Sequence, residues 1–244
     1  MADVVVVTGA SKGIGRDVCM QLLAAHPSLV VVAVARSAGL LTALQQKDPL
    51  RLVPVAGDIA KESTVSQVIA AAKSRGRIRA LVNNAASVSP TGRLFDVAPS
   101  EWHSVWMTNF MAPLRLIHGA VGDLERVVNV TSSTSQAPVP GFGPYGVTKS
   151  AINYLTAAMS IEYPEITAIA FYPGVVDTSM NCDALAAARA YTTRDMSAVV
   201  QKLEAPIPTD VPAAIIANLA MRADRALSGK YFGYSDPEMD PYSA

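Results

Sequence analysis

The chain has 244 residues, of which 50% are hydrophobic and 16% are charged, so one α/β domain with a large core can account for its length. Lys and Arg number 20, as do Asp and Glu, and the absence of a basic tract argues against a nucleic-acid partner. No apolar run is long enough for a bilayer, and the first residues do not resemble a secretory signal, so we expect no membrane partner. Cys19 and Cys182 lie far apart and form no metal-ligand motif, which suits a reducing, cytoplasmic location.

Short β-branched runs alternate with helical stretches along most of the chain. The predicted strands are 4–8, 29–36, 50–58, 80–86, 126–132 and 166–174. The predicted helices are 15–26, 40–46, 63–75, 100–120 and a segment from about 145 to 163. Strands that are apolar on both faces and alternate with helices form parallel sheets covered on both sides. The pattern therefore predicts an α/β fold with a single doubly wound parallel sheet, a Rossmann fold with helices on both faces.

The last quarter of the chain is less regular. Residues 179–207 have a weakly anchored helical pattern and are predicted to form a substrate-binding lid. A helix is expected at 209–224 and a short edge strand at 229–234. Because no internal linker or repeat is visible, residues 1–244 are predicted to form one domain.

Three glycines, Gly9, Gly13 and Gly15, lie between the first strand and the first helix in "VVVVTGASKGIGRDV". Glycines let a pyrophosphate approach the backbone closely, and the helix N-terminus offers free N–H groups and a positive dipole end. A flexible turn with incidental glycines is the alternative. The position between an apolar strand and a helix favours a dinucleotide site.

The second strand ends in Arg36 and Ser37, where NAD sites usually carry an acidic residue. With Lys12 in the glycine turn, two cations and a hydroxyl suit the 2′-phosphate of NADP(H). Asp58 ends the third strand and has two interpretations on spacing. It either accepts a hydrogen bond from the adenine amino group or caps the helix near residue 63.

Tyr145 and Lys149 are four residues apart, so they share one face of a helix. A nearby ammonium group is expected to lower the pKa of a phenol, which could then donate a proton to a carbonyl oxygen. Ser132 ends the fifth strand and could be a second hydrogen-bond donor. Tyr-x-x-x-Lys pairs are also common on helix surfaces, so the pair alone is weak evidence.

Seven motifs in order, "TGASKGIG", "AGDI", "LVNNAA", "TNF", "VVNVTSS", "YGVTK" and "YPGVVDT", resemble those of the short-chain dehydrogenase/reductase family over nearly the whole chain. The resemblance implies that Tyr145 is the general acid and that Lys149 binds the nicotinamide ribose. It implies that Ser132 orients the substrate carbonyl, with Ser133 as the rival if the register slips. It also implies that the main-chain carbonyl of Asn109 holds a water in a proton relay.

The resemblance further implies an NADP(H) site in which Asn83 and the "NAA" that follows it, Asn84, Ala85 and Ala86, lie near the adenosine ribose. Val175 and Thr178 would hold the carboxamide. The full set of expected cofactor residues is Gly9, Ser11, Lys12, Gly13, Ile14, Gly15, Arg36, Ser37, Asp58, Ile59, Asn83, Ala85, Tyr145, Lys149, Pro173, Gly174, Val175, Val176 and Thr178.

The segments "EYPEITAIAFYPGVVDTSM" and "LSGKYFGY" resemble the sepiapterin reductase and benzil reductase branch of the family. Gly233 takes the place where a sepiapterin reductase has a pterin-anchoring aspartate, although Asp236 could compensate. The absence of an acidic residue at position 233 favours NADPH-dependent reduction of an apolar, benzil-like 1,2-diketone to a hydroxyketone. Five residues could line the apolar pocket, although ordinary packing explains each of them at least as well: Trp106, Gly141, Phe142, Met180 and Tyr191.

Other functions remain open at this point. They are reduction of sepiapterin, oxidation of an alcohol with NADP, and NADP(H) sensing without turnover. Sensing proteins usually lose the tyrosine or the lysine, and a purely structural domain would not explain the glycine turn together with Arg36. The apolar helices at 100–120 and after Tyr145 could pair with copies of themselves, so we expect a homodimer or a homotetramer.

Overall fold

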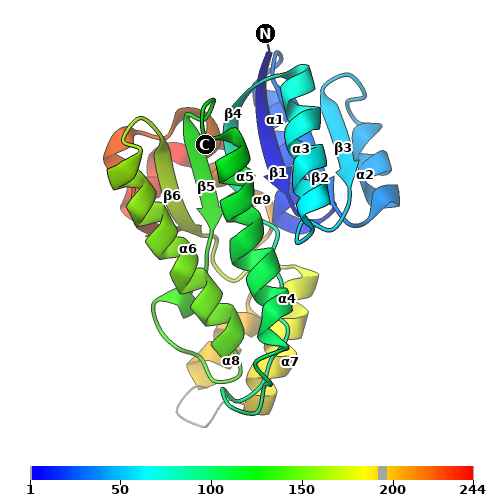
Figure 1. Ribbon diagram of the computed structural model, residues 1–244. Coiled ribbons are helices and arrows are strands. Elements are labelled where there is room, and N and C mark those ends of the chain that lie inside the picture. Colours follow the sequence, from blue (N-terminus) through cyan, green and yellow to red (C-terminus); the bar gives the residue numbers. More distant parts are fainter. Residues whose placement is uncertain (1, 192–196, 244) are drawn as a thin grey trace.

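The computed structural model describes residues 2–191 and 197–243, and these residues form one seven-stranded parallel sheet with helices on both faces (Figure 1). The strand order is β3-β2-β1-β4-β5-β6-β7. The strands are Ala2–Thr8 (β1), Val30–Ala35 (β2), Leu52–Ala56 (β3), Gly76–Asn83 (β4), Arg126–Val130 (β5), Thr167–Tyr172 (β6) and Tyr231–Gly233 (β7). The chain winds outward in both directions from the neighbours β1 and β4, which confirms the predicted doubly wound α/β fold.

Helices pack on each face of the sheet around a separate apolar core. The helices are Gly13–Ala25 (α1), Ala38–Gln45 (α2), Glu62–Arg75 (α3), Trp102–Trp106 (α4), Ala112–Ala120 (α5), Gly143–Glu162 (α6), Ser179–Tyr191 (α7), Ser197–Glu204 (α8) and Asp210–Arg222 (α9). One core joins the sheet to α1, α2 and α9, and the other joins it to α3, α5 and α6, which lie in front in Figure 1.

The central strand β1 shows why the sheet forms. Its residues 4–7 are all valine and all fully buried. Val5 and Val7 belong to the core with α1 and α9, whereas Val4 and Val6 belong to the core with α3, α5 and α6. Because successive side chains point to opposite faces, a continuous apolar run is what a strand covered on both sides requires.

Three predicted elements differ from the structure. The strand predicted at 80–86 begins earlier and ends at Asn83, because Gly76 already pairs with Ala2. The helix predicted at 100–120 is divided into α4, a π-helix at Met107–Met111 and α5. The predicted 179–207 segment forms α7 and α8, and its residues 192–196 lie outside the described residues.

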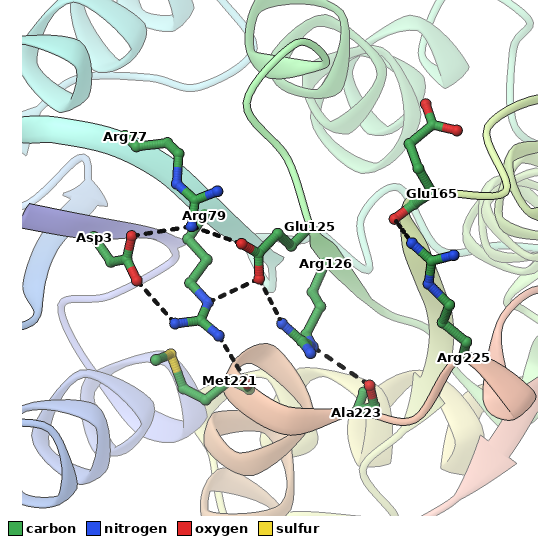
Figure 2. A network of polar contacts seen from close by, with 9 residues as sticks. All are labelled: Asp3, Arg77, Arg79, Glu125, Arg126, Glu165, Met221, Ala223 and Arg225. Carbon is green, nitrogen blue, oxygen red and sulfur yellow. Dashed lines mark hydrogen bonds and ion pairs between the residues drawn. The ribbon is translucent and has the colours of Figure 1, made fainter.

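At the amino ends of the strands, opposite charges pair with one another (Figure 2). We call Asp3, Arg77, Arg79, Glu125 and Arg126 the amino-end charge network. Arg79 pairs with Asp3 at 2.8 Å, and Arg77 pairs with Glu125 at 2.6 Å. These pairs connect β1 and β4 to the residue that precedes β5.

The amino-end charge network also reaches the last turn of α9. Arg79 donates to the carbonyl of Met221 at 3.5 Å, and Arg126 donates to the carbonyl of Ala223 at 3.4 Å. These carbonyls lie at the helix C-terminus, where cations are favoured by the helix dipole and by the unpaired C=O groups. The network therefore holds α9 against the sheet.

Candidate active site

A cleft of about 1300 Å³ lies along the carboxyl ends of β1 to β6. In a doubly wound sheet this edge is where ligands bind, beside the point at which the connections turn to opposite faces. The cleft is lined by all but three of the predicted site residues. The exceptions are Gly15, Asn83 and Asn109.

The glycine turn has the backbone conformation and the close packing that its residue types allow. Gly9 and Gly13 have φ angles of 70° and 56°, in the left-handed region that favours glycine. Gly15 lies beneath the cleft, and a Cβ at that position would be only 2.4 Å from the carbonyl oxygen of Gly9. No side chain caps the N-terminus of α1, so its first N–H groups remain available to a ligand.

The two predicted phosphate-binding cations lie at this end of the cleft. Lys12 Nζ donates to the Ser179 hydroxyl at 2.6 Å, which connects the glycine turn to the start of α7. Arg36 and Ser37 are exposed and line the cleft. Among the described residues, the Arg36 side chain makes no hydrogen bond or ion pair. It therefore remains available to an anionic group.

Asp58 closes a loop and does not cap a helix. Its Oδ1 accepts from the N–H of Ala60 at 3.0 Å, whereas α3 begins at Glu62 and has Lys61 as its N-cap residue. The helix-cap interpretation was therefore wrong. The carboxylate lines the cleft, as the adenine interpretation requires, together with Ile59.

Asn83 does not lie in the cleft as expected. Its side chain is buried within the sheet and donates to Asn129 Oδ1 at 2.8 Å. Asn84, Ala85 and Ala86 line the cleft in its place. The neighbouring Asn84 also donates to the carbonyl of Thr8 at 2.9 Å, which ties the end of β4 to the end of β1.

The catalytic candidates Ser132 and Tyr145 come together between the end of β5 and the first turn of α6. Their side chains are close enough for the Ser132 hydroxyl to favour the ionised form of the Tyr145 phenol. The Ser132 Oγ also accepts from Thr134 N at 3.2 Å and from Thr134 Oγ1 at 3.0 Å, which fixes its orientation. The rival Ser133 is exposed at the cleft wall. The structure thus places Ser132 next to the tyrosine, as predicted.

Lys149 is only 3% exposed, and its Nζ donates to the Val130 carbonyl at 2.7 Å. The ammonium lies 5.6 Å from the centroid of the Tyr145 ring. Burial lowers the pKa of Lys149 to about 8. Burial also raises the pKa of Tyr145 to about 12, although the Ser132 hydroxyl acts in the opposite direction. The pKa of Tyr145 in the folded chain is therefore above its ordinary value and not below it as expected, because desolvation of the phenol dominates.

Asn109 lies behind the cleft wall on the π-helix at Met107–Met111. Its Oδ1 accepts from Ser87 N at 2.8 Å, and its Nδ2 donates to Ser87 O at 2.9 Å and to Thr148 Oγ1 at 3.1 Å. The side chain is thus fully occupied in joining the loop after β4 to α6. π-Helical turns are frequent at functional sites.

The loop after β6 lines the cleft from Pro173 to Asn181. Gly174 has a φ angle of 85°, and a Cβ there would meet the Tyr234 ring at 2.6 Å. Val175 O accepts from Ile207 N at 2.8 Å, and this bond anchors the lid segment after α8. Thr178 Oγ1 donates to Val176 O at 3.3 Å.

The apolar wall of the cleft is built by α7, α8 and the loop before α6. Buried Val88 and Phe142 pack with Ala187 and Ala188, and the partly buried residues against them are Val139, Tyr145, Met180, Ala184, Val200 and Leu203. Of the five predicted pocket residues, Phe142 and Met180 line the cleft. Trp106 instead stacks near Phe110, with ring centroids 5.0 Å apart, and Tyr191 packs on Gly141.

Several cleft residues were not predicted from the sequence. They include His103 and Ser104 of α4, Tyr172 at the end of β6 and Lys202 of α8. Tyr172 directly precedes the recognised "PG" pair. No motif in the sequence marks the residues of α4 and α8 as part of the cleft.

Comparisons with known proteins agree with this geometry. A family model described as short chain dehydrogenase matches residues 3–189. The chain therefore belongs to the short-chain dehydrogenase family.

Three curated proteins illustrate its relatives. An uncharacterized oxidoreductase of Saccharomyces cerevisiae is 30% identical over 98% of both chains. A benzil reductase of the (S)-benzoin-forming type, from the same yeast, is 26% identical over 99% of both chains. The sepiapterin reductase of Rattus norvegicus is 31% identical over 72% of this chain and 75% of its own.

Solved structures show the same fold. A short-chain dehydrogenase/reductase of Saccharomyces cerevisiae matches with a TM-score of 0.92 and 29% identity, over 99% of this chain and all of its own. A blue fluorescent protein from a metagenomic library, solved in complex with NADPH, matches with a TM-score of 0.80 and 26% identity, over 98% of both chains. Among the described residues, no helix combines the length and the apolar character needed to cross a membrane.

Proposed function

We propose that this protein is an NADPH-dependent carbonyl reductase that converts an apolar, benzil-like 1,2-diketone into a hydroxyketone. The observation that carries the proposal is the joint position of Ser132, Tyr145 and Lys149 in one cleft, beside an apolar wall. A benzil reductase among the relatives supports the same substrate class, because benzil is a 1,2-diketone.

The described residues fit NADP(H). The pyrophosphate would lie on the glycine turn, where any side chain at Gly15 would collide with the Gly9 carbonyl. Arg36, which has no acidic neighbour at the end of β2, would hold the 2′-phosphate together with Lys12 and Ser37. The NADPH-bound structural relative supports the same cofactor.

When bound, the cofactor supplies a hydride to the carbonyl carbon. Tyr145 donates the proton that the carbonyl oxygen needs, and Ser132 holds that oxygen with a hydrogen bond. Lys149 provides a positive charge close to the ring of Tyr145. That charge would stabilise the phenolate once the proton has left.

The apolar wall supports a diketone rather than a pterin. Asp236 is a poor substitute for a pterin anchor, because its Oδ2 accepts from Gly233 N at 2.7 Å and neither residue lines the cleft. A neighbouring carbonyl makes the attacked carbon more electrophilic. The activation is lost after one reduction, so the hydroxyketone should accumulate.

The test is consumption of NADPH by the purified protein with a panel of aromatic diketones, quinones, aldehydes and sepiapterin. We expect benzil-like diketones to be reduced with the highest kcat/KM and to yield one hydroxyketone. Sepiapterin reduction that is far more efficient than reduction of any diketone would favour the pterin alternative. Oxidation of alcohols by NADP would favour the dehydrogenase alternative, and binding of NADPH without turnover would favour a sensor.

We also propose a homodimer, or a homotetramer built from it. Val147, Tyr154 and Ile161 are spaced by seven residues on the outer face of α6 and are 45%, 79% and 80% exposed. A second copy of the helix could cover this stripe about a two-fold axis. A monomer in sedimentation at micromolar concentration would contradict the proposal. The free cysteines Cys19 and Cys182 support a reducing, cytoplasmic location.

A further inference from the structure

Tyr172 is a second phenol in the cleft that the reaction above does not use. It is the last residue of β6 and directly precedes Pro173. Along this strand Ile169 and Phe171 belong to the core with α9, whereas Ala168 belongs to the core with α6. Because side chains alternate along a strand, Tyr172 projects to the face that carries α6 and Tyr145.

The two phenols are close enough to influence each other electrostatically. The pKa of Tyr145 is raised mainly by burial, but a charge on Tyr172 raises it further. Tyr172 also lines the cleft and is partly buried. It therefore shares the space in which a substrate would lie against Tyr145.

The hydroxyl of Tyr172 is available to a ligand. Among residues 2–191 and 197–243, its side chain makes no hydrogen bond. Its main-chain carbonyl, by contrast, accepts from Tyr234 N at 2.9 Å, so the backbone that carries it is fixed. A buried phenol usually finds a hydrogen-bond partner, and a fixed one in a cleft can provide that bond to a substrate.

We propose that Tyr172 is a specificity-determining residue that donates a hydrogen bond to the second carbonyl oxygen of a 1,2-dicarbonyl substrate. Tyr145 and Ser132 hold the oxygen of the carbonyl that is reduced. A monoketone occupies only this first pair of donors, whereas a dicarbonyl occupies all three. The inference rests on the proposed function and names the group that selects its substrate class.

The experiment compares two substrates of nearly equal shape. Benzil has two adjacent carbonyls, and deoxybenzoin has a methylene in place of one. For Tyr172→Phe we expect kcat/KM with NADPH to fall about three- to tenfold for benzil and to stay within twofold for deoxybenzoin. The dissociation constant of NADPH should not change.

Tyr154→Phe is the matched control, because it makes the same change on the exposed face of α6 at a residue that does not line the cleft. It should leave the benzil to deoxybenzoin ratio unchanged. An equal loss with both substrates in Tyr172→Phe, or no loss with either, would overturn the inference while the proposed function stands.

A wild-type protein that reduces no diketone would overturn the proposed function instead. In that case the dissociation constants of benzil and deoxybenzoin, measured by fluorescence with the NADP-bound protein, decide the inference. Weaker binding of benzil alone in Tyr172→Phe would still support it. Equal binding by wild type and variant would overturn it.

Discussion

At the amino ends of β1, β4 and β5, charged side chains pair with one another in the amino-end charge network. At the carboxyl ends of the same sheet, Arg36 has no partner among the described residues, and Lys149 is buried without a carboxylate. Both ends contain cations, but those of the amino-end charge network pair with carboxylates, whereas Arg36 and Lys149 have no carboxylate partner among the described residues. The difference shows which end stabilises the fold and which end is built to receive a ligand.

The two ends should therefore respond differently to mutation. A change at the carboxyl end should alter binding or turnover and leave stability unchanged or improved. A change at the amino end should reduce stability and leave turnover unchanged. Substitutions at four positions test this contrast.

The largest effect is expected at Tyr145. Tyr145→Phe keeps the ring but removes the proton donor, so kcat should fall about 1000-fold while the dissociation constant of NADPH stays within about twofold. Lys149→Ala should damage both quantities, since this side chain is proposed to serve the cofactor and the acid. Tyr154→Phe, on the exposed face of the same helix, is the control and should behave as wild type. Substantial turnover in Tyr145→Phe would remove the tyrosine from the proposed role.

Arg36 should decide between the two nicotinamide cofactors. Arg36→Asp should weaken NADPH binding about 10- to 100-fold, because a charge-assisted bond to the 2′-phosphate is lost and a like charge is added. NADH should bind better than it does to wild type. Arg93→Asp, at an exposed site outside the cleft, should leave the ratio of the two dissociation constants unchanged. Equal use of both cofactors by wild type would refute the assignment.

Lys149 should reduce the stability of the fold that holds it. Its pKa in the folded chain, about 8, is below the ordinary value of about 10.4. Between these values the unfolded chain binds more protons, so wild-type stability rises with pH in that window. Lys149→Met should raise the free energy of unfolding by about 1–2 kcal/mol at pH 7, even with the bond to Val130 lost.

The difference in the free energy of unfolding between Lys149→Met and wild type should become smaller as the pH is raised toward 10. Urea denaturation at pH 7 and pH 10 would measure both values. A variant less stable than wild type at pH 7 would show that the hydrogen bond to Val130 outweighs the burial of the charge.

The smallest effect is expected in the amino-end charge network. Burial favours the neutral form of Glu125, but the hydrogen bond of Arg77 and the charges of Arg79, Arg77 and Arg126 together hold its pKa below the ordinary value. Such a carboxylate stabilises the fold above its unfolded pKa, and the contribution is lost as the pH falls through the folded value. Glu125→Gln should lower the free energy of unfolding by about 1 kcal/mol or less at pH 7.

The difference between Glu125→Gln and wild type should disappear as the pH falls through the lowered pKa of Glu125, because the carboxylate is then protonated. Neither kcat nor KM should change. Glu162→Gln, an exposed change outside the network, is the control. A loss of turnover in Glu125→Gln would mean that the two ends of the sheet are coupled.

Most of the fold could be predicted because the strands are apolar runs and the glycines mark the turn after β1. The position of Asn83 could not be predicted, since it depends on how β4 pairs with its neighbour. Val4 pairs with Ile78 but Val5 pairs with Ala80, so one extra residue shifts the register in the middle of the strand. The register shift decides to which face of the sheet each later side chain of β4 points, and the shift itself leaves no pattern in the sequence.

The pKa of Tyr145 was mispredicted for a related reason. The sequence shows that a lysine lies four residues away, but it does not show that Lys149 is buried and Tyr145 partly buried. The residues that α4 and α8 contribute to the cleft depend on how these helices pack, which local sequence does not encode. The Ser132 and Tyr145 pair could be predicted because each lies beside a recognisable strand end or helix start.

The π-helix at Met107–Met111 also affects how this protein can change over evolution. Its extra residue turns the following helix by about 100° relative to the preceding one. His103 and Ser104 of α4 line the cleft before this turn, whereas Ala112 and Leu116 enter the core after it. One continuous helical segment thus carries two independently oriented faces. Substrate preference can diversify along α4 while the packing face of α5 is conserved, and deletion of one residue between them would disturb both at once.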